Sequence, residues 1–147
     1  MRVLVLFAHP LETSFGAALH AKSVQSLRER GHAVDDCDLY AEGFDPVMTR
    51  QDRLEYYDLS RNRRRVAAYV DRLLAAEALV FSFPVWNMGP PAILKGFIDR
   101  VFLPGVSFDL QDNGYVPRLF NIGRLGVVCT YGGGRLLTFF SGDPLRH

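Results

Sequence analysis

Four stretches of the chain carry the pattern of hydrophobic and polar positions expected for strands of a parallel sheet. Residues 2–8, 78–83 and 125–130 are apolar at almost every position, which is typical of strands covered on both faces. Residues 34–40 alternate apolar and polar side chains instead, so we expect this strand on the outside of the sheet. Pro84 is expected to end the third strand, because proline cannot donate to a ladder of hydrogen bonds.

Three stretches between these strands show the 3.6-residue period of amphipathic helices. They cover residues 15–30, residues 61–76 and residues 90–102, the last opening on a pair of prolines that suits a first helical turn. Residues 42–53 and 106–121 lack a sustained period and are predicted to be irregular. The helices therefore fall between successive strands.

This alternation predicts a doubly wound α/β domain with a parallel sheet of strand order 2-1-3-4. The length of 147 residues suits one domain over residues 1–147. In that order two strands separate Cys37 from Cys129, a distance of about 14 Å at a strand spacing of about 4.8 Å. A disulfide needs Cα atoms within about 7 Å, so we expect both thiols to be free.

Composition and charge narrow the classes of function. A net charge of +1 gives no field suited to nucleic acid or to an anionic membrane surface. No stretch approaches the roughly 18 apolar residues of a membrane span, and the apolar start of the chain has the pattern of a strand rather than of a signal peptide. The histidines are scattered and the cysteines lack metal-ligand spacing. We therefore expect a cytoplasmic protein without a metal site.

Three segments that follow strand ends have an unusual composition. In open α/β sheets, ligands bind beyond the carboxyl ends of the strands, so these segments are predicted to share one rim. Residues 9–16 lead into a helix N-terminus, where orphan N–H groups favour an anion. Residues 84–91 hold the only tryptophan, Trp86, in a loop bounded by prolines, and residues 130–134 contain three glycines that leave the backbone open to a ligand.

Each segment also has a purely structural interpretation. Thr13 or Ser14 can act simply as an N-cap, and His9 can bond to the backbone of its own loop. Trp86 can pack its loop onto the core, and the glycines can form no more than a flexible turn. The argument for a binding site therefore depends on all three segments meeting at one rim.

The most distinctive stretch of the chain is FPVWNMGPPAILKGFIDRVF at residues 83–102, to which AHP at 8–10, TSF at 13–15, DLY at 38–40 and FDP at 44–46 add. On these motifs the chain resembles the NAD(P)H dehydrogenase (quinone) family, the DT-diaphorase-like branch of flavodoxin-fold proteins. The resemblance implies a flavodoxin-like fold, FAD or FMN as cofactor, and a ping-pong reaction. In that reaction NAD(P)H reduces the flavin by hydride transfer, and a quinone or similar acceptor takes the two electrons.

By position, the resemblance assigns flavin contacts to all three segments and leaves the catalytic residues unassigned. The implied flavin-binding residues are His9, Thr13, Ser14, Phe15, Gly16, Pro84, Val85, Trp86, Asn87, Met88, Thr130, Tyr131, Gly132 and Gly133. Phe108 and Tyr115 match the region that lines the acceptor pocket from the partner subunit of a homodimer. Gly16 stands where relatives often have asparagine, so one side-chain contact to the flavin is lost.

A five-stranded flavodoxin-like domain needs roughly 35 more residues than this chain offers after its fourth strand. We therefore expect the fifth strand and the last helix to be missing, residues 132–147 to add no strand, and the fourth strand to lie at the edge of the sheet.

Two other functions remain open at this stage: a flavodoxin-type electron carrier, although such carriers are typically acidic, and a flavin-binding regulatory subunit. A receiver domain needs acidic residues after the first and third strands. The chain has Ala8-His9 and Phe83-Pro84 there, so a receiver domain is rejected.

Overall fold

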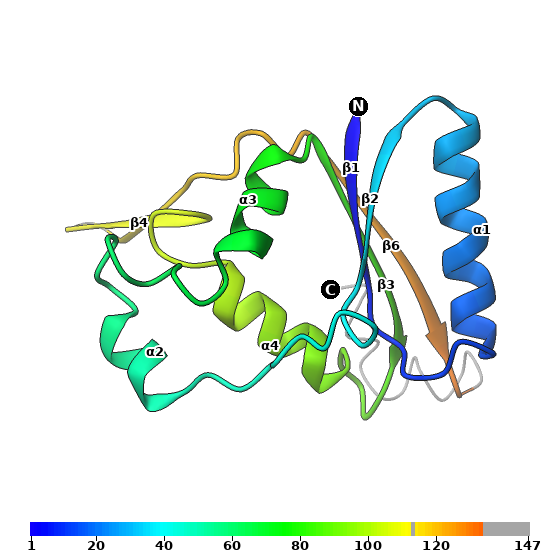
Figure 1. The fold of residues 1–147 in the computed structure, drawn as a ribbon, viewed down its shortest axis with the longest axis horizontal. Helices are drawn as coiled ribbons and strands as arrows, with labels where there is room; N and C mark the ends of the chain where they lie inside the picture. The colour runs from blue at the N-terminus through cyan, green and yellow to red at the C-terminus, as the bar shows by residue number, and fades with distance from the viewer. Residues whose placement is uncertain (113, 134–147) are drawn as a thin grey trace.

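Short apolar and alternating stretches form a four-stranded parallel sheet in the computed structural model, which describes residues 1–112 and 114–133 (Figure 1). The strands are β1 (Arg2–Phe7), β2 (Ala33–Asp38), β3 (Ala78–Val85) and β6 (Arg124–Tyr131). Their spatial order is β2-β1-β3-β6, with every neighbouring pair parallel. This is the predicted order 2-1-3-4, because β6 is the fourth strand of this sheet along the chain.

Helices cover both faces of the sheet and divide the core into two layers (Figure 1). On one face, α1 (Phe15–Glu29) packs Val24 against Val3 and Val5 of β1. On the other, α3 (Ala67–Ala75) and α4 (Ala92–Val101) belong to the larger cluster, which includes Leu4, Leu6, Leu73 and Phe97. Successive β1 side chains therefore serve opposite layers, as the period of two requires.

Three predicted boundaries were wrong. Residues 42–53 are not wholly irregular, because α2 (Arg50–Glu55) begins there with a capping box between Thr49 and Asp52. The helix predicted over 61–76 begins only at Ala67, since residues 60–66 form successive turns. Residues 106–121 contain an antiparallel hairpin of β4 (Phe108–Gln111) and β5 (Gly114–Pro117).

The two cysteines lie on β2 and β6, at opposite sides of the four-stranded sheet, and no disulfide joins them, as predicted. Burial raises the pKa of the Cys37 thiol to about 12, so this thiol is protonated and unreactive at neutral pH. Among residues 1–112 and 114–133, no helix has both the length and the hydropathy to cross a bilayer.

Within the described sheet, β6 is an outermost strand, and its Leu125 and Val127 are more than half exposed. We also predicted that residues 132–147 add no strand. Of these, residues 134–147 lie outside the described part of the chain.

Candidate functional site: a rim of three loops

The three segments singled out in the sequence meet at the carboxyl ends of β1, β3 and β6. His9 and Trp86 make an edge-to-face contact with ring centroids 5.9 Å apart, which joins the first segment to the second. Thr130 pairs in register with Pro84, which joins the second to the third. A Cβ placed on Gly16 would lie 3.6 Å from His9 and 3.9 Å from the Thr130 hydroxyl. The predicted rim is therefore one continuous surface.

The first segment leads into a helix N-terminus, where some hydrogen-bond donors have no partner within the helix. The Ser14 hydroxyl accepts from the Ala17 N–H at 3.0 Å and so acts as the N-cap of α1, while its own proton remains to be donated. The first intrahelical bond runs from Ala18 to the Ser14 carbonyl. The N–H groups of Phe15 and Gly16 precede that bond and are available to an anion.

His9 is held by its own loop, because its Nδ1 accepts from the Leu11 N–H at 3.0 Å. Because Nδ1 accepts this bond, Nε2 is the ring nitrogen that can interact with a ligand. Thr13 and Phe15 are exposed beside the N-cap, Phe15 at 72%. The N-cap and loop-backbone interpretations of Ser14 and His9 are thus confirmed, and each residue keeps one polar group for a ligand.

The second segment is a tight two-residue turn held in an unfavourable conformation. Trp86 and Gly89 exchange both backbone hydrogen bonds, at 2.9 and 3.0 Å. Asn87 and Met88 between them have φ of 48° and 65°, a left-handed region that costs a residue such as methionine about 1 kcal/mol. Trp86 remains 42% exposed, so it does not anchor the core. A strained loop that displays an aromatic side chain is characteristic of a ligand-binding position.

Pro84 does not end β3, contrary to expectation, but lies buried within the strand, which runs on to the half-buried Val85. The ladder between β1 and β3 stops at Phe7 and Ser82. Beyond that point β3 has one described neighbour, β6, so a proline ring can replace an N–H on the open side. The strand thereby extends two residues farther and delivers Trp86 directly to the rim.

The third segment begins inside β6, since Thr130 and Tyr131 still pair with Pro84 and Val85. Gly132 follows, exposed and with no atom within 4 Å of the place where a Cβ would be. Gly133 is exposed as well. A flat ligand can therefore approach the main chain here without meeting a side chain.

Phe108 and Tyr115 do not join this rim. They face each other across the β4–β5 hairpin, with ring centroids 5.3 Å apart, and Tyr115 is 72% exposed. The hairpin lies beyond α3 and α4, on the side of the molecule away from the sheet (Figure 1). Within one chain these two rings therefore cannot line the same pocket as Trp86.

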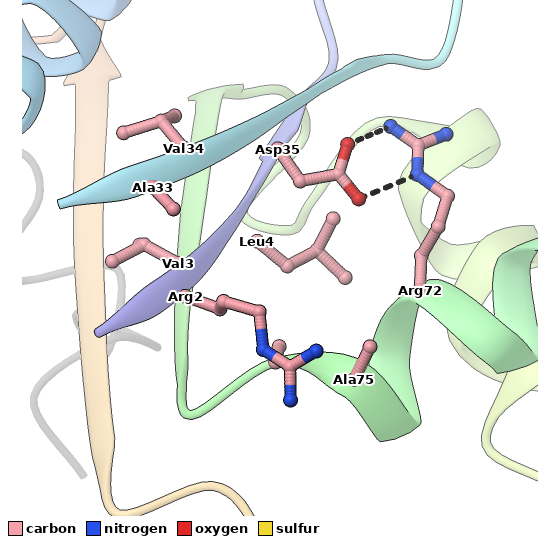
Figure 2. A pocket seen from close by; sticks show the side chains of 9 residues that line it. Arg2, Val3, Leu4, Ala33, Val34, Asp35, Arg72 and Ala75 are labelled. Atoms are coloured by element: carbon pink, nitrogen blue, oxygen red, sulfur yellow. Dashed lines mark hydrogen bonds and ion pairs between the residues drawn. The ribbon is translucent and has the colours of Figure 1, made fainter.

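A cavity of about 270 Å³ lies elsewhere, at the amino ends of β1 and β2 and against α3 (Figure 2). Its walls are mostly apolar, and Arg72 at its edge is held by Asp35 and Glu42, both at 2.7 Å. Ligands of open α/β sheets bind at the carboxyl ends instead, so this cavity is not the candidate site. No group of three or more His, Cys, Asp or Glu side chains suited to a metal occurs in the part of the chain that the structure describes.

The rim fits a flavin by the chemistry of its donors. It combines N–H groups at a helix start for a phosphate, an exposed indole for a flat ring, and open glycine backbone for the ring's polar edge. Sequence reasoning missed the strained turn, although Asn87, which tolerates φ above zero, stands directly before it in a proline-bounded loop.

Comparisons with known proteins agree with this architecture. The model of a family described as having a flavodoxin-like fold matches residues 1–140. NAD(P)H dehydrogenase [quinone] 1 of Rattus norvegicus is 32% identical over 123 residues, which cover 73% of this chain and 45% of the rat protein. An uncharacterized NAD(P)H oxidoreductase of Escherichia coli (strain K12) is 35% identical over 108 residues, covering 73% of this chain and 55% of that protein.

The solved structure of an NAD(P)H:quinone oxidoreductase from Methanothermobacter marburgensis superposes with a TM-score of 0.86 at 28% identity, covering 99% of this chain and 74% of the other. The chain spans about half the length of the first curated relatives it matches. With the match to the family model over nearly its whole length, the chain belongs to the family of proteins with a flavodoxin-like fold, and its relatives include NAD(P)H:quinone oxidoreductases.

Proposed function

We propose that the chain is the flavin-binding portion of a cytoplasmic NAD(P)H:quinone oxidoreductase that transfers two electrons. The observation that carries the proposal is the meeting of the three loops, through the ring contact of His9 with Trp86 and the position of Gly16, where a Cβ would lie within 4 Å of both His9 and Thr130. Relatives whose names include NAD(P)H and quinone support the two substrates.

In this proposal, Ser14 and the N–H groups of Phe15 and Gly16 bind the flavin phosphate. Trp86 packs against the ring system, and the backbone of residues 87–89 and 132–133 faces its polar edge. We assign contacts with the ribityl chain to His9 and Thr13. A bound flavin would supply hydride transfer from NAD(P)H and two-electron transfer to the acceptor, and these residues would hold and orient it.

The acceptor pocket requires a second chain in this proposal. Phe108 and Tyr115 lie too far from the rim of their own chain, on an exposed hairpin. In a homodimer these rings would close the pocket over the partner's flavin. An exposed Tyr115 beside the half-buried Phe108 on a projecting hairpin suits such an interface.

The direct test is the visible absorption spectrum of the purified protein, with the released cofactor identified by chromatography. A flavin spectrum and oxidation of NADH or NADPH by a soluble quinone are expected. A protein that binds flavin but does not oxidise NAD(P)H would be an electron carrier or a regulatory subunit. A protein that stays colourless and does not quench added FAD or FMN would contradict the proposal.

Trp86→Ala provides the residue-level test, with Trp86→Phe as its control. Loss of the exposed indole is expected to weaken flavin affinity about tenfold, the value of one aromatic stacking contact, while the free energy of unfolding changes by less than about 0.5 kcal/mol. Trp86→Phe should retain most of the affinity. Equal losses of affinity and stability in Trp86→Ala would assign Trp86 to packing instead.

A further inference from the structure

The cavity of about 270 Å³ at the amino ends of β1 and β2 lies between the sheet and helix α3 (Figure 2). We call it the amino-end cavity. Its walls come from residues 2–4 of β1, residues 33–35 of β2, and residues 72, 75 and 76 at the end of α3. None of these residues belongs to the three loops of the candidate flavin site or to the β4–β5 hairpin. The amino-end cavity is therefore built from residues that neither the flavin site nor the homodimer uses.

Small side chains leave this space unfilled. Alternate residues of β1 point toward α3, and Leu4 is one of them, because it belongs to the core cluster on that side of the sheet. Beside it in the walls are Ala33 on β2 and Ala75 and Ala76 at the end of α3. Each alanine contributes a single methyl group, so the helix and the sheet do not close on each other at this edge. The resulting cavity is mostly apolar.

Arg72 fixes one side of the cavity. Its Nε and Nη2 donate to the two oxygens of Asp35 at 2.9 and 2.7 Å, and its Nη1 donates to those of Glu42 at 2.9 and 2.7 Å. Figure 2 shows the pair with Asp35, which ties α3 to β2 in a bidentate geometry. Both carboxylates are already bonded to Arg72, so neither is free to bind a cationic ligand in the cavity.

Arg2 places a second guanidinium beside the cavity, and this one has no carboxylate partner. Its side chain is exposed and extends from β1 toward Ala75 (Figure 2). Within residues 1–112 and 114–133, no Asp or Glu oxygen lies within 4 Å of this guanidinium. The carboxylate of Glu77 accepts instead from the Arg2 backbone N–H, at 2.6 Å. An unpaired cation next to apolar walls is suited to an apolar ligand that carries one anionic group.

We propose that the amino-end cavity binds a small organic carboxylate whose apolar body is about one aromatic ring. The carboxylate accepts hydrogen bonds from the Arg2 guanidinium, and the ring lies against Leu4 and the alanines of α3. An apolar cavity of about 150 Å³ can hold benzene, so a cavity of about 270 Å³ has room for a ring with a short acidic arm. The binding is independent of the flavin chemistry proposed above.

The test is a titration of the ¹⁵N-labelled full chain with phenylacetate, followed by amide chemical shifts. Saturable shifts are expected at residues 2–4, 33–35 and 72–76, with a Kd of about 1 mM or lower, as suits a ligand of this size. Phenylacetamide keeps the ring without the charge, and acetate keeps the charge without the ring. Each is expected to bind at least about tenfold more weakly. Trp86 emission should stay constant, because the rim takes no part.

Two variants with matched controls test the two parts of the site. Arg2→Gln is expected to weaken phenylacetate binding about tenfold, whereas Arg124→Gln, which removes another exposed arginine at the start of a strand, should bind like the wild type. Ala75→Leu fills the cavity and is expected to abolish binding. Ala68→Leu adds the same side chain at an exposed position of α3 and should not affect binding. Circular dichroism of each variant establishes that the fold is retained.

Four results would overturn the proposal. The first is the absence of amide shifts with up to about 10 mM phenylacetate. The second is a set of shifts confined to the three loops of the flavin site, with quenching of Trp86. The third is equal affinity for phenylacetamide and phenylacetate, and the fourth is an equal loss of affinity in Arg2→Gln and Arg124→Gln. The Arg2→Gln comparison holds even if Ala75→Leu fails to fold.

Discussion

The turn at residues 86–89 and the helix α4 that follows it belong to one distinctive stretch of sequence, yet they differ in burial and in backbone strain. The turn is exposed, and it holds Asn87 and Met88 at positive φ. In α4, Leu94, Phe97 and Val101 are buried almost completely. Strain and exposure serve binding, whereas close packing serves stability, so neighbouring residues in a family-specific motif need not share a role.

Helix α4 packs against the loop that precedes α2 and fixes its position. Arg100, 8% exposed, donates to the Asp45 carbonyl and pairs with Asp52. Gly96 lets Pro46 approach the helix backbone closely. The FDP motif at residues 44–46 and the glycine and arginine of α4 are thus two halves of one contact, which we call the α4 dock. The comparison predicts that changes in the α4 dock cost stability, whereas changes in the turn cost affinity.

Gly96→Ala is expected to have the largest effect on stability. A Cβ at this position would lie within 2.6 Å of the Pro46 Cα and closer still to its Cβ and carbonyl oxygen. Backbone atoms cannot move aside cheaply, so we expect a loss of about 2–3 kcal/mol in urea unfolding. Gly16→Ala is the control, because its Cβ meets nothing nearer than 3.6 Å. Equal stability of the two variants would contradict the claim that the α4 dock stabilises the fold.

Arg100→Met comes next, with Lys95→Met as a matched control on the same helix. Removing the buried guanidinium takes the side-chain donor from the Asp45 carbonyl and one of two nearby cations from the Asp52 carboxylate, which keeps its bonds from Thr49, at a cost of about 2 kcal/mol. Lys95 pairs with Asp99 at the surface, and such i, i+4 pairs contribute only about 0.3–0.5 kcal/mol. Unfolding midpoints in urea measure both. A larger loss for Lys95→Met would mean that the α4 dock does not depend on burial.

Met88→Gly is expected to separate stability from binding within the turn. Glycine relieves about 1 kcal/mol of left-handed strain but adds about 0.5 kcal/mol of unfolded-state entropy, so the protein gains about 0.5 kcal/mol. Flavin affinity is expected to fall at the same time, because the turn loses both its rigidity and the methionine contact. Thermal unfolding and flavin titration give the two numbers. A variant that is less stable than the wild type would show that the turn is not strained.

The pH dependence of stability provides the smallest effect. Burial raises the pKa of Asp52, but hydrogen bonds from the Thr49 backbone and hydroxyl, with Arg100 and Arg65 nearby, outweigh burial and hold the pKa below its usual 3.8. The stabilisation is therefore complete above pH 3.8 and is lost as the pH falls through the lower folded-state pKa. Asp52→Asn should flatten this part of the stability profile. If stability falls in acid equally in Asp52→Asn and in the wild type, Asp52 does not cause this pH dependence.

The sheet could be predicted from sequence because buried strands carry long apolar runs, and the alternation of strands and helices fixes few topologies. The hairpin β4–β5 could not, because its four-residue strands are largely exposed and show no buried face. The start of α3 was misplaced because the arginines at 61–65 fit a helix as well as the turns they form. For α2 the sequence did contain a signal, since Thr49 and Asp52 have the spacing of a capping box.

The candidate site was predictable in its location but not in its conformation. Strand ends place His9, Trp86 and Thr130 at one rim whatever the details of the loops. The positive φ of Met88 was not foreseeable, since methionine has no preference for that region. The extension of β3 through Pro84 depends on where β1 stops, and that is a property of the sheet rather than of the residue.

The central claim, that the three loops form a flavin site around Trp86, is tested most directly by tryptophan fluorescence. Trp86 is the only tryptophan in the chain, so emission reports on this rim alone. Titration of the flavin-free protein with FMN and with FAD is expected to quench the emission saturably, at one flavin per chain for the flavin that binds. Emission that stays constant up to about 100 μM of either flavin, a range that includes any affinity useful to the protein, would contradict the account.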